Sequence, residues 1–161
     1  MATYTATERR SSLLNAASHG GAYGVKNLTA TVEVAASTTV GRTISFGHIP
    51  SNARILGSSK LYWDDLATSG SPTLDMGLAA VNGNLANADD PDALGNAGAI
   101  SAAAVNQPVI SEIANHGLPA WDFVASETTD PGGKLEVYGS LVDAPVNAAG
   151  TITLELYYVV D

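Results

Sequence analysis

The chain has 161 residues, seven Lys and Arg against sixteen Asp and Glu, a formal net charge of -9, and no cysteine. This length suits one domain, the lack of cysteine excludes disulfides and thiolate metal sites, and the acidic balance argues against binding to the phosphates of DNA or RNA. No stretch approaches the ~18 consecutive apolar residues of a membrane-spanning helix, so we expect no membrane partner.

The first 27 residues show no sustained hydrophobic period, and we expect an extended N-terminal arm over residues 1–27 with at most a short helix at 11–17. Arg9 and Arg10 lie in this arm. Two interpretations stay open: a frayed terminus with solvated charges, or an arm that becomes ordered on an acidic patch of a neighbour. Residues 1–10 lack the apolar core of a signal peptide, so we expect synthesis in the cytoplasm without export.

Period-two alternation then dominates the chain. It begins at Leu28, where Leu28, Ala30, Val32 and Val34 share one side of a predicted strand. Turn residues such as Pro, Gly, Asn and Asp separate the following segments. The predicted strands are 28–34, 40–46 (with Val40, Ile44 and Phe46 on one side), 53–63, 73–78, 120–125, 134–142 and 151–160, and 109–113 is either a brief strand or a turn.

Residues 79–107 differ from the rest because they are rich in Ala, Asn, Gly and Asp. We expect a long, partly ordered excursion here. Asp90 followed by Pro91 favours a short helix, since Asp caps helix N-termini and Pro is favoured at the first helical position. Residues 100–105 are consistent with either a helix or a strand of small residues.

Seven to nine strands with at most one short helix predict an all-β protein. We expect an antiparallel β-sandwich over residues 28–161, jelly-roll-like in topology, preceded by the arm. The last strand carries apolar residues on both sides near its end. It is therefore either central in the sandwich or buried against another subunit.

The residues offer little catalytic chemistry. The histidines, His19, His48 and His116, are far apart in sequence, each near a turn, and none has metal-ligand spacing. No nucleophile elbow, phosphate loop or dinucleotide fingerprint is present. Residues 89–92 could offer carboxylates to calcium, but solvated turn acids are the simpler interpretation. We predict no catalytic residues, no cofactor and no metal.

Several segments resemble structural proteins of tailed bacteriophages. Residues 49–57 read Ile-Pro-Ser-Asn-Ala-Arg-Ile-Leu-Gly, and residues 60–66 read Lys-Leu-Tyr-Trp-Asp-Asp-Leu. Residues 73–78 and the terminal segment 150–161 also match strands of such proteins. The likeness is greatest to a head decoration, or cement, protein.

That resemblance implies a virion structural protein without catalysis. Proteins of this kind are small sandwiches that assemble as trimers and clamp neighbouring capsid subunits, often through an N-terminal arm. The implied partners are the major capsid protein and further copies of the chain in a homotrimer, on the capsid surface after synthesis in the bacterial host cytoplasm. The expected contact residues are Tyr4, Arg9, Arg10 and Tyr23 on the arm, with Tyr157 and Val159 on the outer face of the last strand.

A second function from another class stays open. Tyr62 and Trp63 precede Asp64 and Asp65, and aromatic rings beside carboxylates are typical of a sugar-binding surface. The chain would then be a carbohydrate- or receptor-binding sandwich, such as a phage fibre or spike head.

Overall fold

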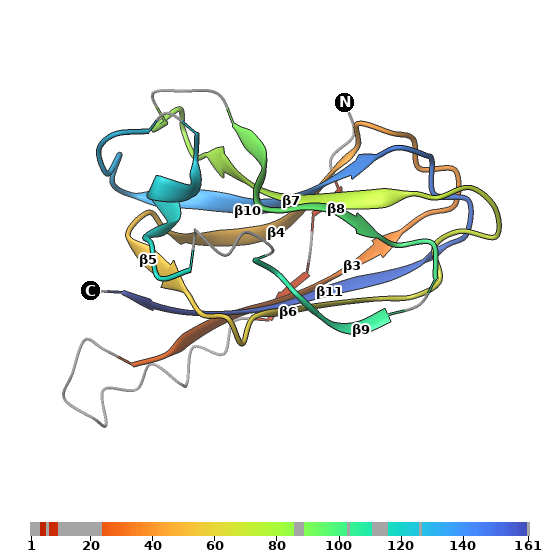
Figure 1. Ribbon diagram of the computed structural model, residues 1–161, viewed down its shortest axis with the longest axis horizontal. Coiled ribbons are helices and arrows are strands. Elements are labelled where there is room, and N and C mark those ends of the chain that lie inside the picture. The colour runs from red at the N-terminus through yellow and green to blue at the C-terminus, as the bar shows by residue number, and fades with distance from the viewer. Residues whose placement is uncertain are drawn as a thin grey trace.

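The computed structural model is a sandwich of two β-sheets, which confirms the predicted fold class (Figure 1). It describes residues 4–5, 7–9, 24–85, 89–102, 104–110, 116–125 and 127–160. The first sheet, here the β10 sheet, has the order β1 (Tyr4–Thr5), β4 (Thr43–Pro50), β10 (Lys134–Val142), β7 (Thr73–Ala80) and β8 (Asp90–Ala99). The second, the β11 sheet, has the order β2 (Thr7–Arg9), β3 (Lys26–Val34), β11 (Gly150–Val160), β6 (Lys60–Trp63) and β9 (Ala104–Pro108), and β5 (Ala53–Ile55) pairs with β11 outside this order.

The core lies between the sheets and follows the predicted alternation. On β10, Leu135 and Leu141 are fully buried, and on β11 the same holds for Ile152 and Leu154. Each such side chain stabilises the fold by roughly 1.5–3 kcal/mol relative to an exposed position. The strand bounds 134–142 agree with the sequence prediction. β11 begins at Gly150, one residue before its predicted start, and β3 begins at Lys26, two residues before its predicted start.

The long strands pair as one folded-over hairpin. β7 pairs with β8, β6 with β9, β4 with β10, and β3 with β11, all antiparallel. In this order each pair lies, along the sequence, between the two strands of the next pair. Successive pairs belong alternately to the β10 sheet and the β11 sheet. The pairing of β1 with β4 is parallel, so the arm departs from the antiparallel pattern.

β8 bulges across β7 at Gly77. The register moves from Leu78 to Met76 on β7 while it moves from Asp90 to Gly95 on β8, so β8 carries extra residues. A Cβ on Gly77 would lie 2.3 Å from the carbonyl oxygen of Asp90. Only glycine permits the two backbones to approach so closely.

The predicted strand at 120–125 is wrong. Residues Ala120–Phe123 form a 3-10 helix, and its buried residues, Ala120 and Phe123, are three positions apart, as this helix requires. The amide of Trp121 donates to the carbonyl of Ser51 at 3.0 Å. This tertiary contact fixes the segment against the turn between β4 and β5.

The expected excursion at 79–107 is also largely wrong. Within it, β8 and β9 are strands, and no helix begins at Asp90. The Asp90 carboxylate accepts a hydrogen bond from the amide of Ala125 at 2.8 Å, so it does not cap a helix. Pro91 is accommodated because β8 is an edge strand whose bulge does not need every backbone donor.

Two further strand predictions need correction. Val40 is 49% exposed and lies before β4, because β4 begins only at Thr43. The segment 53–63 is divided into β5 and β6 by a turn in which the amide of Ser59 donates to the carbonyl of Leu56 at 2.9 Å. The short helix expected at 11–17 and most of segment 109–113 lie outside the described residues.

Candidate functional site

The predicted arm contributes short strands to both sheets. Tyr4 lies in β1, which pairs with β4, and Arg9 lies in β2, which pairs with β3. Because β4 and β3 belong to different sheets, β1 and β2 lie at the edges of different layers. Arg10 and Tyr23 lie outside the described residues. Contact of these four residues with another chain stays a prediction.

Tyr157 and Val159 belong to the central strand of the β11 sheet. β11 pairs with β3 along one edge and with β5 and β6 along the other, so it is the central strand of this sheet. The Ser59 hydroxyl accepts from the amide of Tyr157 at 2.9 Å and donates to its carbonyl at 3.1 Å. Tyr157 and Val159 are half-buried, so part of each side chain is open to a neighbour.

The outer face of the β11 sheet around these residues is polar, and it carries Arg54 opposite Val159 and Lys60 opposite Glu155. The hydroxyls of Thr31 and Thr153 form a hydrogen bond of 2.9 Å across β3 and β11. The hydroxyl of Tyr62 donates to the Glu155 carboxylate at 3.1 Å. Partial desolvation, followed by this hydrogen bond, raises the pKa of Tyr62. Ordered hydroxyls on a flat face suit contact with another protein surface.

The sugar-binding interpretation needs an exposed Trp63, and the structure does not place this side chain at the surface. Trp63 is only 8% exposed and points into the core, where its indole N–H donates to the carbonyl of Ala102 at 2.8 Å. The Asp64 carboxylate accepts hydrogen bonds from the amide and hydroxyl of Thr151 at 2.7 and 2.8 Å. These bonds lower the pKa of Asp64. Asp65 accepts from the amide of Ala67 at 3.2 Å. Both acids therefore support turns.

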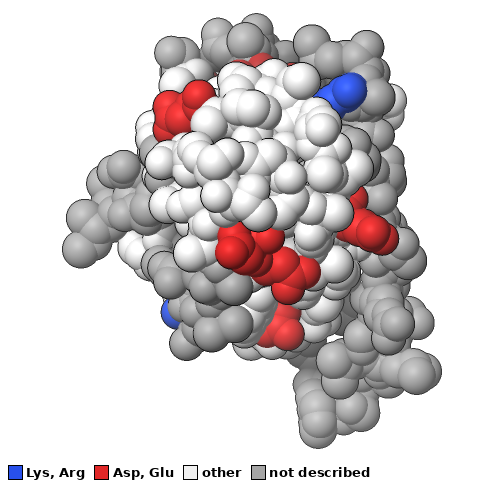
Figure 2. All heavy atoms as spheres, turned by 90° about the vertical axis from the view of Figure 1, so that its right-hand side faces the viewer, with Lys and Arg blue, Asp and Glu red and all other residues white. Residues whose placement is uncertain are grey.

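The same end of the sandwich is held by side-chain hydrogen bonds between two turns. Asn147, in the turn between β10 and β11, accepts from the amide of Thr68 at 2.7 Å and donates to the carbonyl of Ser69 at 2.6 Å. Figure 2 shows this end of the molecule, where acidic side chains form separate groups on a largely uncharged surface. The described part of this face is a continuous surface and not a cleft.

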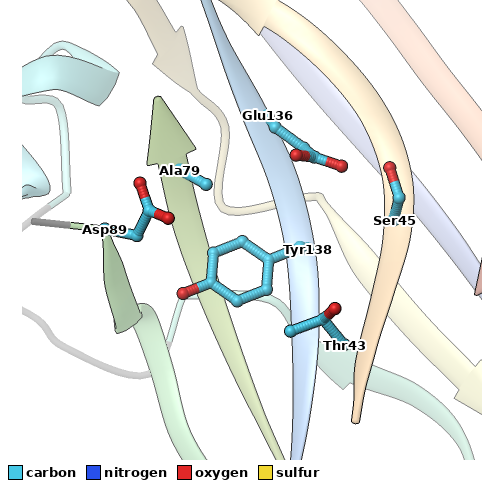
Figure 3. A pocket seen from close by; sticks show the side chains of 6 residues that line it. All are labelled: Thr43, Ser45, Ala79, Asp89, Glu136 and Tyr138. Atoms are coloured by element: carbon cyan, nitrogen blue, oxygen red, sulfur yellow. The ribbon is translucent and has the colours of Figure 1, made fainter. Parts of the chain in front are cut away.

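A small hollow opens on the outer face of the β10 sheet (Figure 3). Its volume is about 190 Å³. The lining comes from β4, β7 and β10 and from the residue just before β8, and it includes two carboxylates and one phenol. The lining residues are Thr43, Ser45, Ala79, Asp89, Glu136 and Tyr138.

Tyr138 is the unusual residue of the hollow. Alternation along β10 places it on the outer face, yet it is only 8% exposed. It lies opposite Gly77, over which the β8 backbone crosses, and this crossing covers a side chain that would otherwise face solvent. Burial first, and then the negative charges of Asp89 and Asp90, raise the pKa of Tyr138, so its hydroxyl stays protonated.

The carboxylates considered as calcium ligands each accept a hydrogen bond from a different group of the protein. Asp89 accepts from the amide of Ala80 at 2.9 Å, and Asp92 accepts from the Asn96 side chain at 3.0 Å. Among the described residues, no group of three or more His, Asp or Glu is arranged to hold a metal ion.

No helix of the described chain is long and apolar enough to span a bilayer. His48 and His116 lie on separate elements, and His19 is outside the described ranges.

Two solved structures share this fold. A chain in the capsid of Ralstonia phage GP4 superimposes with a TM-score of 0.58 at 22% identity, covering 86% of this chain and 85% of that one. A chain in the capsid asymmetric unit of cyanophage Pam1 superimposes with a TM-score of 0.56 at 19% identity, covering 91% of this chain and 92% of that one. No protein-family profile and no curated protein match the sequence. The likeness therefore establishes a shared fold that extends over most of all three chains.

Proposed function

We propose that the chain is a structural component of a tailed-phage capsid, and that it binds the outer surface of the shell as a decoration, or cement, protein. The observation that carries the proposal is the match with two capsid chains over at least 85% of the length of each partner. Coverage this complete in both directions means that the matched chains are about as long as this one. A separate small capsid chain, and not a domain inserted into a large protein, is thus the fitting counterpart.

We further propose that the sandwich is a jelly roll. With β5 and β6 counted as one strand, the eight strands from β3 to β11 pair first with last, second with seventh, third with sixth and fourth with fifth. A long hairpin rolled into two four-stranded layers has this pairing, which is the jelly-roll arrangement. The strands β1 and β2 are additions from the arm at the edges.

The charge favours the outside of the shell. A net charge of -9 would oppose close contact with packaged DNA, because each phosphate carries a negative charge. On the outer surface the same charge favours solubility. The resemblance to decoration proteins supplies the proposed partners, which are the major capsid protein and other copies of this chain in a homotrimer.

The mechanism is mechanical. A decoration protein that contacts more than one shell subunit opposes their separation when packaged DNA presses outward. Specific interfaces bury roughly 1,600 Å² in total, and simultaneous contacts at linked sites can raise overall affinity by ~10²–10⁴ over a single contact. The arm residues and the outer side of β11, with Tyr157 and Val159, are the proposed contact surfaces.

The direct experiment uses capsids of the phage proposed to carry the chain, prepared without it. Purified chain is added, the capsids are sedimented, and bound chain is measured by saturation. The temperature at which DNA becomes accessible to a dye is then compared with and without the chain. We expect saturable binding and a higher release temperature.

Particle reconstruction would place the bound chain on the outer surface, and its mass in free solution would give the oligomeric state. A chain that does not sediment with capsids refutes the decoration role. Saturable binding without a rise in release temperature would mean that the chain binds capsids but does not stabilise them.

A further inference from the structure

The hollow beside Tyr138 has the chemistry of a receptor for one cationic side chain. Two of its six lining residues are carboxylates, and none is Lys, Arg or His. The Glu136 carboxylate is half-buried and makes no hydrogen bond with a described residue. Asp89 uses one oxygen for the amide of Ala80. Acceptor capacity for a positive group therefore remains on both acids.

Tyr138 supplies a second, independent observation. More than nine-tenths of its surface is buried, and Figure 3 shows its ring extending from β10 across the hollow toward Asp89. No described residue forms a hydrogen bond with its hydroxyl. No fully buried side-chain oxygen among the described residues lacks a partner, so the hydroxyl itself is not enclosed. It is open to a polar group of a ligand that enters the hollow.

The size and geometry select among cations. A volume of about 190 Å³ is below the roughly 300–1,000 Å³ of ordinary small-molecule pockets. A divalent metal would need converging ligands, and the described residues contain no group of three or more. A guanidinium can donate to two carboxylates at once while its plane lies against an aromatic ring. An arginine side chain is therefore the ligand whose chemistry matches the two carboxylates and the aromatic ring of the hollow.

We propose that the hollow formed by Tyr138, Glu136 and Asp89 receives an arginine side chain of the shell protein to which the chain binds. This proposal rests on the proposed capsid function, which supplies the partner. It favours a partner over the chain itself because only seven of 161 residues are Lys or Arg, against sixteen acids. His48 lies opposite Glu136 in the ladder but does not line the hollow, so it leaves the site open.

The chemistry is tested first with a short probe. The tripeptide Ac-Gly-Arg-Gly-NH2 is titrated into the labelled protein while backbone and Tyr138 ring resonances are followed by NMR. We expect saturable shifts at Glu136, Tyr138 and Ser45, and none with Ac-Gly-Gln-Gly-NH2. The variant Glu136→Gln should weaken binding about tenfold, because the amide oxygen can still accept a hydrogen bond but the negative charge that strengthens it is removed.

Two further variants define the site. Tyr138→Phe keeps the ring and removes the hydroxyl, and it should weaken binding about threefold. Glu33→Gln removes a carboxylate from the exposed face of β3 in the other sheet, and it is the matched control. Equal shifts with the glutamine peptide, or equal affinity in Glu136→Gln and Glu33→Gln, would overturn the arginine receptor.

The partner is tested by capsid sedimentation with the same variants. If wild type and Glu33→Gln bind while Glu136→Gln binds about tenfold less, the shell protein is the source of the arginine. If all three bind equally, the capsid function stands and the role of the hollow falls. If wild type does not bind, the capsid function and the shell partner both fail, and the peptide titration separately decides the arginine chemistry.

Discussion

Replacing Gly77 with alanine tests the crossing of β8 over β7, on which the burial of Tyr138 depends. The added Cβ would lie 2.3 Å from the carbonyl oxygen of Asp90, and 2.5 and 2.6 Å from the carbonyl carbon and Cα of Pro91. All three atoms belong to the backbone of β8. No rotamer change can relieve these contacts, so the bulge itself must move.

The size of the effect follows from the kind of atoms involved. Overpacking that displaces backbone typically costs about 1–3 kcal/mol. For a domain of this length, 1 kcal/mol lowers Tm by roughly 2–4 °C. We therefore expect Gly77→Ala to lower Tm by about 2–12 °C. Movement of β8 would also disturb Leu94, which is fully buried in the core.

Two other glycines give a graded series. A Cβ on Gly139 would meet side chains only, with Leu74 Cδ1 at 2.9 Å and a ring carbon of Phe46 at 3.3 Å, and side chains can adjust. A Cβ on Gly98, also in a strand, would lie 3.4 Å from the carbonyl oxygen of Leu74, which is an ordinary contact. We expect the loss of stability to fall in the order Gly77→Ala, Gly139→Ala, Gly98→Ala. Gly98→Ala should be neutral or stabilising by a few tenths of a kcal/mol, since alanine restricts the unfolded chain.

The assay is urea unfolding followed by tryptophan fluorescence, with all variants at one protein concentration so that self-association affects them equally. Tm from differential scanning calorimetry provides a second measurement. Equal midpoints for Gly77→Ala and Gly98→Ala would refute the reasoning, because they would mean that β8 does not cross β7 at the stated distance.

Three other predictions concern the turns, the arm and the central strand. Asp64→Ala should lower the urea midpoint at pH 7. The pKa of Asp64 in the folded protein lies below its ordinary value of 3.8. The stability difference is therefore fully present above pH 3.8 and should disappear as the pH falls through the folded pKa. A midpoint difference that does not shrink as the pH is lowered below 3.8 would contradict the role of the carboxylate. Deleting residues 1–24, which stops just before β3, should weaken capsid sedimentation while circular dichroism still reports a β-sandwich; full affinity after the deletion would exclude the arm as a contact. The double variant Tyr157→Ser and Val159→Ser should lower either the oligomer mass of the purified chain, measured by light scattering, or its affinity for capsids. If neither value changes, the outer face of β11 is not one of the contact surfaces.

Local sequence patterns were sufficient to predict a strand where one face of that strand packs against the core between the sheets. The alternation predicted the strand at 134–142 with its bounds and the last strand to within one residue of its start. Leu135, Leu141 and Ile152 in these strands are fully buried. One side of such a strand must be apolar because it faces the other sheet. The fold class follows from several such segments, and it could be predicted from the residues alone.

Pairing partners could not be predicted in the same way. Residues 79–107 lack the bulky alternation of a strand, yet β8 and β9 form because β7 and β6 each present a free edge. Backbone groups at such an edge pair with almost any extended chain. In contrast, segment 120–125 alternates Trp121 and Phe123 as a strand would, but a hydrogen bond to Ser51 fixes it as a 3-10 helix.

The candidate hollow was likewise decided by tertiary structure. The sequence places Tyr138 on the outer face of β10 and gives no sign that it is buried. Only the crossing of β8 at Gly77 covers it and brings Asp89 and Glu136 to one opening. Asp89 and Glu136 are far apart along the chain, and their approach depends on the register of β7 with both β8 and β10. Side-chain alternation is a local property that a sequence records directly, whereas the register between distant strands is set by the packing of the whole sandwich.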